Sequence, residues 1–201
     1  MIRKTTLESA FDVAARYLPT YHYSERHAIA SVDAAPAVIL SAMKNYDDRQ
    51  DKVLNTLLTV REWPSRAAAV LGRKNALHAR TRFGLDDFCL LEETSREITF
   101  GLIGRFWKLD YGLFPIASAA DFQDFQQPGV AKLVMSFAVE PNARGNWRLM
   151  TETRIWCPDT KSRLMLLPYW VVIRLASGWI RLRTLNQIKK NAEQAHHHPA
   201  T

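Results

Sequence analysis

The sequence predicts an α+β fold in which helices lead into an antiparallel sheet and a long helix closes the chain. Apolar residues recur at helical spacing up to about residue 71, alternate in stretches between residues 88 and 155, and return to helical spacing after Pro168. A chain of 201 residues, 47% of them hydrophobic and 23% charged, has room for one domain with a substantial core.

Three segments are expected along the chain. Residues 1–20 form an N-terminal arm or short helix, 21–195 form the single domain, and 196–201 form a flexible tail. The domain opens with a strand over 21–33 that runs into a helix holding Pro36 in its first turn. Apolar residues at helical spacing predict two short amphipathic helices here: Ile39, Ala42, Met43 and Tyr46 mark the first, and Leu54, Leu57 and Leu58 the second.

A third short helical piece over 66–71 and an exposed basic loop over 73–87 precede the strands. Residues 88–94 add one strand, and 114–129 are read as a short strand plus a loop over the ligand site. The turn-rich residues 140–146 predict an antiparallel hairpin. Three strand faces should point inward: Phe100, Leu102, Gly104 and Phe106; Leu133, Met135, Phe137 and Val139; Trp147, Leu149, Thr151, Thr153 and Ile155.

The final helix is expected to follow Pro168 and to face the sheet with Val172, Ile173, Ala176, Ile180 and Ile188. The apolar stretch from Leu164 to Leu182 is interrupted by a proline, a glycine and two arginines, so a buried helix fits it better than a membrane span. With no signal peptide and only Cys89 and Cys157, we expect a cytoplasmic protein with reduced thiols; one disulfide between them is the alternative.

Four blocks of sequence carry a resemblance to a known superfamily. They are Arg26-His27-Ala28-Ile29-Ala30-Ser31-Val32-Asp33-Ala34-Ala35-Pro36, residues 101–107, residues 151–155 and residues 169–174. With the order of elements from 21 to 195, they resemble the SRPBCC superfamily of START, polyketide-cyclase and birch-pollen-allergen proteins, and in particular bacterial members without assigned function. The resemblance implies a helix-grip fold, in which a curved antiparallel sheet wraps a long C-terminal helix and leaves a hollow for lipids, steroids or polyketides.

The first functional hypothesis is therefore binding or carriage of a hydrophobic small molecule, lipid-like or aromatic, without catalysis. The inward apolar stripes and the last helix supply the candidate wall, with Thr151 and Thr153 as its polar points; a filled core is the alternative for the same stripes. The ligand-binding candidates are Phe100, Leu102, Phe106, Leu133, Met135, Phe137, Leu149, Thr151, Thr153, Tyr169, Val172, Ile173, Ala176 and Ser177.

The second hypothesis is an enzyme of cyclase, dehydratase or hydrolase type, with Arg105, Glu152 or Tyr169 as catalytic candidates. It requires a bulge, because alternation places Arg105, Trp107, Glu152 and Arg154 on the opposite face, where a cross-strand ion pair in solvent is expected. His22, His27 and His78 form no recognisable catalytic set. His196, His197 and His198 could bind a metal as a cluster, but their position favours a flexible tail. No metal and no cofactor are therefore assigned.

The third hypothesis is an interaction protein on an anionic membrane surface. The net charge of +7 and pI of about 9.6 favour anionic partners, and Arg174 and Arg181 fall on one side of the last helix. Nucleic acid is not expected, because the basic loop has only Phe83 as an interleaved aromatic. The sequence defines neither the ligand nor the oligomeric state.

Overall fold

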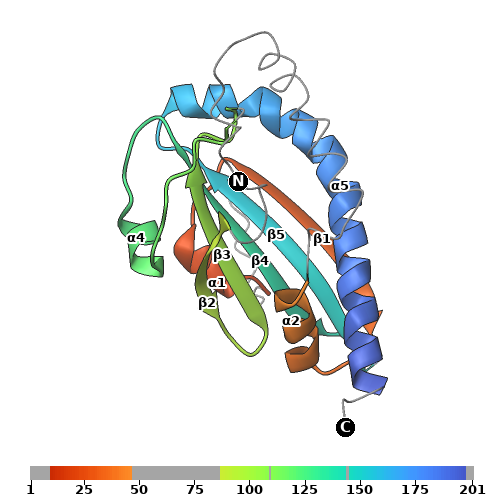
Figure 1. The fold of residues 1–201 in the computed structure, drawn as a ribbon. Helices are drawn as coiled ribbons and strands as arrows, with labels where there is room; N and C mark the ends of the chain where they lie inside the picture. The colour runs from red at the N-terminus through yellow and green to blue at the C-terminus, as the bar shows by residue number, and fades with distance from the viewer. Residues whose placement is uncertain (1–9, 47–86, 109, 144, 198–201) are drawn as a thin grey trace, which may run out of the picture.

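The computed structural model describes residues 10–46, 87–108, 110–143 and 145–197, and between 172 and 179 it describes the backbone, with side-chain detail for Arg174 only. The fold is α+β, as predicted: a five-stranded antiparallel sheet carries helices on both faces (Figure 1). The strand order is β1-β5-β4-β3-β2. The strands are β1 Tyr23–Val32, β2 Cys89–Glu93, β3 Glu97–Gly104, β4 Ala131–Pro141 and β5 Trp147–Trp156.

The predicted unit of a strand entering a helix is confirmed. β1 leads into α2 (Pro36–Lys44), with Pro36 at the start of the helix, where its missing N–H costs no hydrogen bond. Ile39, Leu40 and Met43 of α2 are buried. The expected second helix with Leu54, the piece over 66–71 and nearly all of the basic loop lie outside the described residues.

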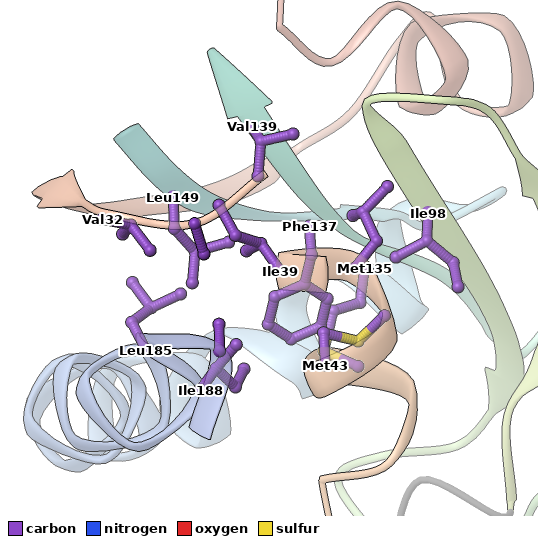
Figure 2. Close-up of a cluster of buried hydrophobic side chains, with 13 residues drawn as sticks. Val32, Ile39, Met43, Ile98, Met135, Phe137, Val139, Leu149, Leu185 and Ile188 are labelled. Atoms are coloured by element: carbon purple, nitrogen blue, oxygen red, sulfur yellow. The ribbon is translucent and has the colours of Figure 1, made fainter. Parts of the chain in front are cut away.

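The face of the sheet that carries α2 and α5 (Thr160–His197) is called the inner face. The three predicted strand faces do point there, because residues opposite one another in the register share a face. Figure 2 shows the main packing, in which Leu185 and Ile188 of α5 approach Leu149 and Phe137 of the sheet. We call this group, which also holds Ile39, Met43, Met135 and Val139, the α2 cluster.

The opposite, outer face of the sheet is also covered. α1 (Asp12–Tyr17) and α4 (Ala119–Asp124) pack there, with Phe122 of α4 fully buried against Val134 and Ile103. The prediction for 114–129 is therefore wrong: this segment contains α4 and lies on the outer face, although Phe114 does form a short bridge with Ile103. The Ser118 hydroxyl caps α4 by accepting a hydrogen bond from the Asp121 amide at 3.1 Å.

A buried carboxylate holds α1 against the sheet. Glu97 accepts hydrogen bonds from the amides of Val13 at 2.9 Å and Ala14 at 3.1 Å, and from the Thr99 hydroxyl at 3.0 Å. These backbone amides belong to the first turn of α1, where no helical partner exists for them. The N-terminal segment is thus part of the packed molecule from Ala10 onward.

The last helix begins earlier than predicted. α5 starts at Thr160, and Pro168 lies inside it. Asp159 precedes the helix and caps it, accepting from the Ser162 amide at 2.8 Å. In Figure 1, α5 crosses one end of the sheet and then runs alongside β1. It ends at His197, so the first two residues of the predicted tail are helical. No helix among the described residues is long and apolar enough to cross a membrane.

Candidate functional site

A polar cluster lies in the middle of the inner layer, between two apolar groups. One apolar group is the α2 cluster; the other, the Trp170 cluster, consists of Leu102, Phe106, Ala131, Ile155, Cys157, Leu166 and Trp170. Along β1, β5 and α5 alike, the side chains change from the Trp170 cluster to polar residues and then to the α2 cluster. The polar residues are Glu25 and His27 of β1, Thr151 and Thr153 of β5, and Arg181 of α5, and we call them the inner polar cluster.

Two hydrogen bonds are made within the inner polar cluster, and a glycine of α5 packs over one of them. His27 Nε2 lies 2.7 Å from Glu25 Oε1, and Arg181 Nη1 donates to the Thr151 hydroxyl at 3.2 Å. Gly178 of α5 lies over the first pair, because a Cβ atom added there would sit 3.4 Å from His27 Cε1. Burial lowers the pKa of Arg181, and the charge of Glu25 opposes that effect. The arginine is therefore a cation held in a poorly solvated layer.

Two atoms of this cluster have no hydrogen-bond partner. They are the hydroxyl of Thr153, a residue that is 2% exposed, and the Nε of Arg181, and both are buried. Leaving a buried donor unpaired typically costs about 1–3 kcal/mol. The Thr153 hydroxyl is the only polar group of that side chain, so the residue makes no compensating side-chain hydrogen bond among the described residues.

A row of side chains leads from this cluster across the inner face. The register places Glu25 opposite Thr153, Thr153 opposite Met135, Met135 opposite Phe100, and Phe100 opposite Leu90. The row therefore changes from charged at β1 to apolar at β2. Phe100 and Leu133 belong to central strands and are only half-buried, whereas their neighbours Leu102 and Met135 are buried. These two side chains are thus incompletely covered by the part of the chain that the structure describes.

Most of the predicted ligand-binding residues are brought together on this inner face. Met135, Phe137 and Leu149 lie in the α2 cluster, Leu102 and Phe106 in the Trp170 cluster, and the half-buried Phe100, Leu133 and Tyr169 pack at the margins of these clusters. Thr151 and Thr153 stand between the two clusters. The side chains of Val172, Ile173, Ala176 and Ser177 lie outside the description.

The expected ion pair in solvent is wrong. Glu152 and Arg154 do lie on the outer face, but they are only 1% and 5% exposed. Glu152 accepts from Arg26 Nε at 2.7 Å and lies 2.9 Å from Arg154 Nη2, while Arg154 Nη1 donates to the Leu18 carbonyl oxygen at 3.3 Å. The segment that joins α1 to β1 therefore shields this pair from water.

The three catalytic candidates do not converge. Glu152 is on the outer face, and Arg105 Nε donates to the carbonyl oxygen of Gly129 at 3.0 Å, with the guanidinium over the Phe114 ring. Tyr169 packs at the margin of the Trp170 cluster on the inner face. General acid–base chemistry needs its groups within hydrogen-bond reach of one reacting atom. This set does not provide that geometry.

Sequence reasoning missed three members of the inner polar cluster. Glu25 and His27 alternate with Ile29 on β1, and this alternation gave a usable signal that their side chains share the inward face. Arg181 was expected on a basic surface with Arg174; Arg174 is exposed, but Arg181 reaches Thr151 inside. Within the described ranges, no group of three or more metal-ligating side chains is found.

Comparison of the sequence with protein-family models gives no match, and comparison with curated proteins gives none either.

Proposed function

We propose that this protein binds or carries a hydrophobic small molecule on the inner face, between the sheet and α5, in a helix-grip arrangement. The observation that carries the proposal is the row from Thr153 through Met135 and Phe100 to Leu90. It joins an unpaired buried hydroxyl to incompletely buried apolar side chains. A molecule with an apolar body and one polar end would cover these apolar side chains with its body and form a hydrogen bond to the hydroxyl with its polar end.

The burial pattern favours a ligand over a merely loose core. A large apolar side chain on a central strand normally belongs to the buried core, and complete burial of a Phe or Leu is worth about 1.5–3 kcal/mol. Phe100 and Leu133 are only half-buried and so obtain only part of this stabilisation, while Leu102 and Met135 beside them in the sheet are buried. Three interstrand spacings separate β5 from β2, so the row offers an apolar track roughly 14 Å long.

Native mass spectrometry and organic extraction of the purified protein test the proposal. We expect an apolar small molecule to accompany the folded chain, and an added apolar fluorescent probe to bind in competition with it. Phe100→Glu should abolish probe binding, because it places a charge in the track. Leu182→Glu introduces the same charge at an exposed position of α5 and should leave binding unchanged.

A thermal melt of each variant shows whether it is folded. Phe100→Ala serves as a second variant, since it widens the track without adding charge and should still bind the probe. Equal probe binding by wild type and a folded Phe100→Glu variant would place the apolar ligand elsewhere. Absence of any bound or bindable apolar molecule would overturn the proposal.

Exposed side chains on α5 favour a second candidate function, contact with an anionic membrane surface. Leu164, Leu167 and Val171 follow one another at helical spacing and are all exposed, Val171 to 53%. The exposed Lys161 and Arg174 lie at the two ends of this stripe. α5 contains no acidic residue from Thr160 to Ala192. Apolar side chains flanked by basic ones are typical of helices that lie in a membrane interface.

Vesicle sedimentation decides this second candidate. We expect binding to vesicles that contain phosphatidylserine, weaker binding to purely zwitterionic vesicles, and loss of binding in a Leu164→Ser, Val171→Ser double variant. A Leu90→Ser, Leu182→Ser variant removes two exposed apolar side chains outside the stripe and is the matched control. Sedimentation that is insensitive to lipid charge, or equal loss in both double variants, would contradict the candidate.

A further inference from the structure

We propose that the polar end of the ligand is an oxyanion, in the first instance a carboxylate, and that Arg181 and Thr153 bind it inside the inner polar cluster. This inference rests on the proposed ligand site and names the chemical class of its ligand. The observation behind it is that a buried arginine Nε–H and a buried hydroxyl both lack a partner in the same layer.

The hydrogen-bonding groups leave a donor-rich position. Arg181 donates from Nη1 to Thr151, and its buried Nε–H has no hydrogen-bond partner. Thr153 is two residues from Thr151 on the same face of β5, about 7 Å along the strand. The Thr153 hydroxyl can donate to the same acceptor as the guanidinium. Arginine favours carboxylates here because its fork of N–H groups matches two oxygens.

The charges around the site leave room for one more anion. The titratable groups that face Arg181 from the sheet are Glu25 and His27 of β1. The carboxylate of Glu25 is already engaged by His27 at 2.7 Å, so it is not reserved for Arg181. The pKa of Arg181 is still lowered by burial in spite of Glu25. A ligand carboxylate would supply the compensating charge that burial demands.

The apolar row sets the orientation. With the carboxylate at Thr153 and Arg181, the body of the molecule would pass Met135, whose side chain already packs in the α2 cluster, and lie over Phe100 toward the exposed Leu90 of β2. Glu25 lies at the opposite end of the row, beyond Thr153. An apolar acid is thus the ligand class that matches both ends of the row, whereas the corresponding alcohol or ester would add no negative charge beside Arg181 and leave Glu25 as its partial compensation.

Matched pairs of probes test this inference on the full chain. Dodecanoate is compared with dodecanol, and naphthoate with naphthylmethanol, by competition and by calorimetry. We expect wild type to bind the acid of a pair about 10-fold or more tightly than the alcohol, as hydrogen bonds to charged groups suggest. Arg181→Met should bring the two affinities together, and Arg181→Lys, which keeps the charge but loses the fork, should retain part of the preference.

The two threonines provide a control that separates binding from folding. Thr153→Val removes an unpaired buried hydroxyl, so it should raise the melting temperature of the free protein while weakening acid binding. Thr151→Val removes the acceptor of Arg181 and should lower the melting temperature. A variant that harmed binding only through misfolding would not show the opposite signs expected of Thr153→Val.

The probe pairs distinguish failure of the oxyanion inference from failure of the proposed ligand site. If wild type binds acid and alcohol equally, the ligand site stands and the oxyanion inference is overturned. If the acid is preferred but Arg181→Met keeps the preference, the inference is also overturned, because another group must hold the carboxylate. If no member of either pair binds, the ligand site and the inference fall together.

Discussion

At the scale of single residues, the chain buries charge on both faces of one sheet. On the outer face the charges are paired: Glu152 contacts Arg26 and Arg154. On the inner face Arg181 is compensated in part by Glu25. Both arrangements contain a buried arginine Nε without a hydrogen-bond partner, that of Arg154 on the outer face and that of Arg181 on the inner face. On the outer face, the Glu152 carboxylate contacts two arginines directly.

Breaking the outer pair should destabilise the fold strongly. Glu152→Leu leaves Arg154 buried without its carboxylate, and we expect a loss of about 3–5 kcal/mol in the free energy of unfolding. Replacing both residues, by Glu152→Leu with Arg154→Met, should recover most of that loss, since Arg26 is largely in solvent. Urea unfolding measures both variants. A loss below about 1 kcal/mol for the single variant would mean that the pair behaves like an exposed one.

The two thiols should differ in reactivity. Burial, with the charge of Asp159 as a smaller cause, raises the pKa of Cys157 to about 12, and burial also raises the pKa of the half-buried Cys89. Because the thiolate is the reactive form, native protein at neutral pH should alkylate slowly at Cys89 and only after unfolding at Cys157. Mass spectrometry of a Cys89→Ser variant isolates Cys157; rapid labelling of that variant in its native state would contradict the expectation.

Alternation along the strands was enough to predict which side chains share a face, but not what covers each face. Glu152 and Arg154 were correctly separated from Thr151 and Thr153. The prediction that they are exposed to solvent was wrong. The segment that covers them, α1 and its connection to β1, comes from more than 120 residues earlier in the chain. A signal was present on β4, where Val134 and Ala138 make the outer face apolar too.

At the scale of elements, α5 shows how a cap and packing override a proline. Pro168 suggested a helix start because it breaks the helical hydrogen-bond pattern. Asp159 fixes the start earlier, and Leu166 and Trp170 bury the first turns in the Trp170 cluster. These contacts offset the hydrogen bond that Pro168 removes. The apolar pattern of the helix alone could not predict these contacts, since the rest of the cluster comes from β3, β4, β5 and the residues that follow them.

The cap at Asp159 should make stability depend on pH in the acid range. Hydrogen bonds from Gly129 and Ser162 lower the pKa of Asp159 from 3.8 to about 2. A lowered folded-state pKa contributes stability that is present above the unfolded value and disappears as pH falls toward about 2. At neutral pH, the urea midpoint of wild type should therefore be higher than that of Asp159→Asn. The difference between the two midpoints should shrink as the pH falls from 3.8 to about 2. A difference that is independent of pH would contradict this cause.

The inward side of α5 should be far more sensitive than its outward side. Leu185 is fully buried in the α2 cluster, so Leu185→Ala should cost about 2–5 kcal/mol. Leu182, on the same helix, is exposed, and Leu182→Ala should change stability by no more than about 0.5 kcal/mol. Chemical unfolding of the two variants compares them directly. Equal effects would mean that α5 does not pack as described.

At the scale of the whole molecule, one sheet separates two hydrophobic layers. The order of strands and helices followed from the change in apolar period, and the strand–helix unit at Pro36 was predicted correctly. The placement of α1 and α4 on the outer face was not predicted, because short helices with few apolar residues carry little periodic signal. The inner polar cluster was missed for a related reason: Arg181 looks like a surface residue until its neighbours on β5 are known.

Substitutions in the two layers should act independently within one unfolding transition. Ile103 is buried on the outer face and Ile188 on the inner face. Ile103→Val and Ile188→Val should each cost about 0.5–1.5 kcal/mol, and the double variant should equal their sum within about 0.5 kcal/mol. Ile39→Val combined with Ile188→Val, both in the α2 cluster, is the comparison in which coupling is expected. Two separate transitions would show that the layers fold independently.

The pairing of β1 with β5 has a consequence for how the protein is made. β1 ends at Val32 and β5 begins at Trp147, so its partner does not exist until most of the chain has been translated. At typical synthesis rates the wait is on the order of ten seconds. During that time the open backbone edge of β1 and its Ile29 would be exposed on the ribosome. Charged neighbours in the same strand, Glu25 and Arg26, are the kind of side chain that discourages premature pairing with another nascent chain.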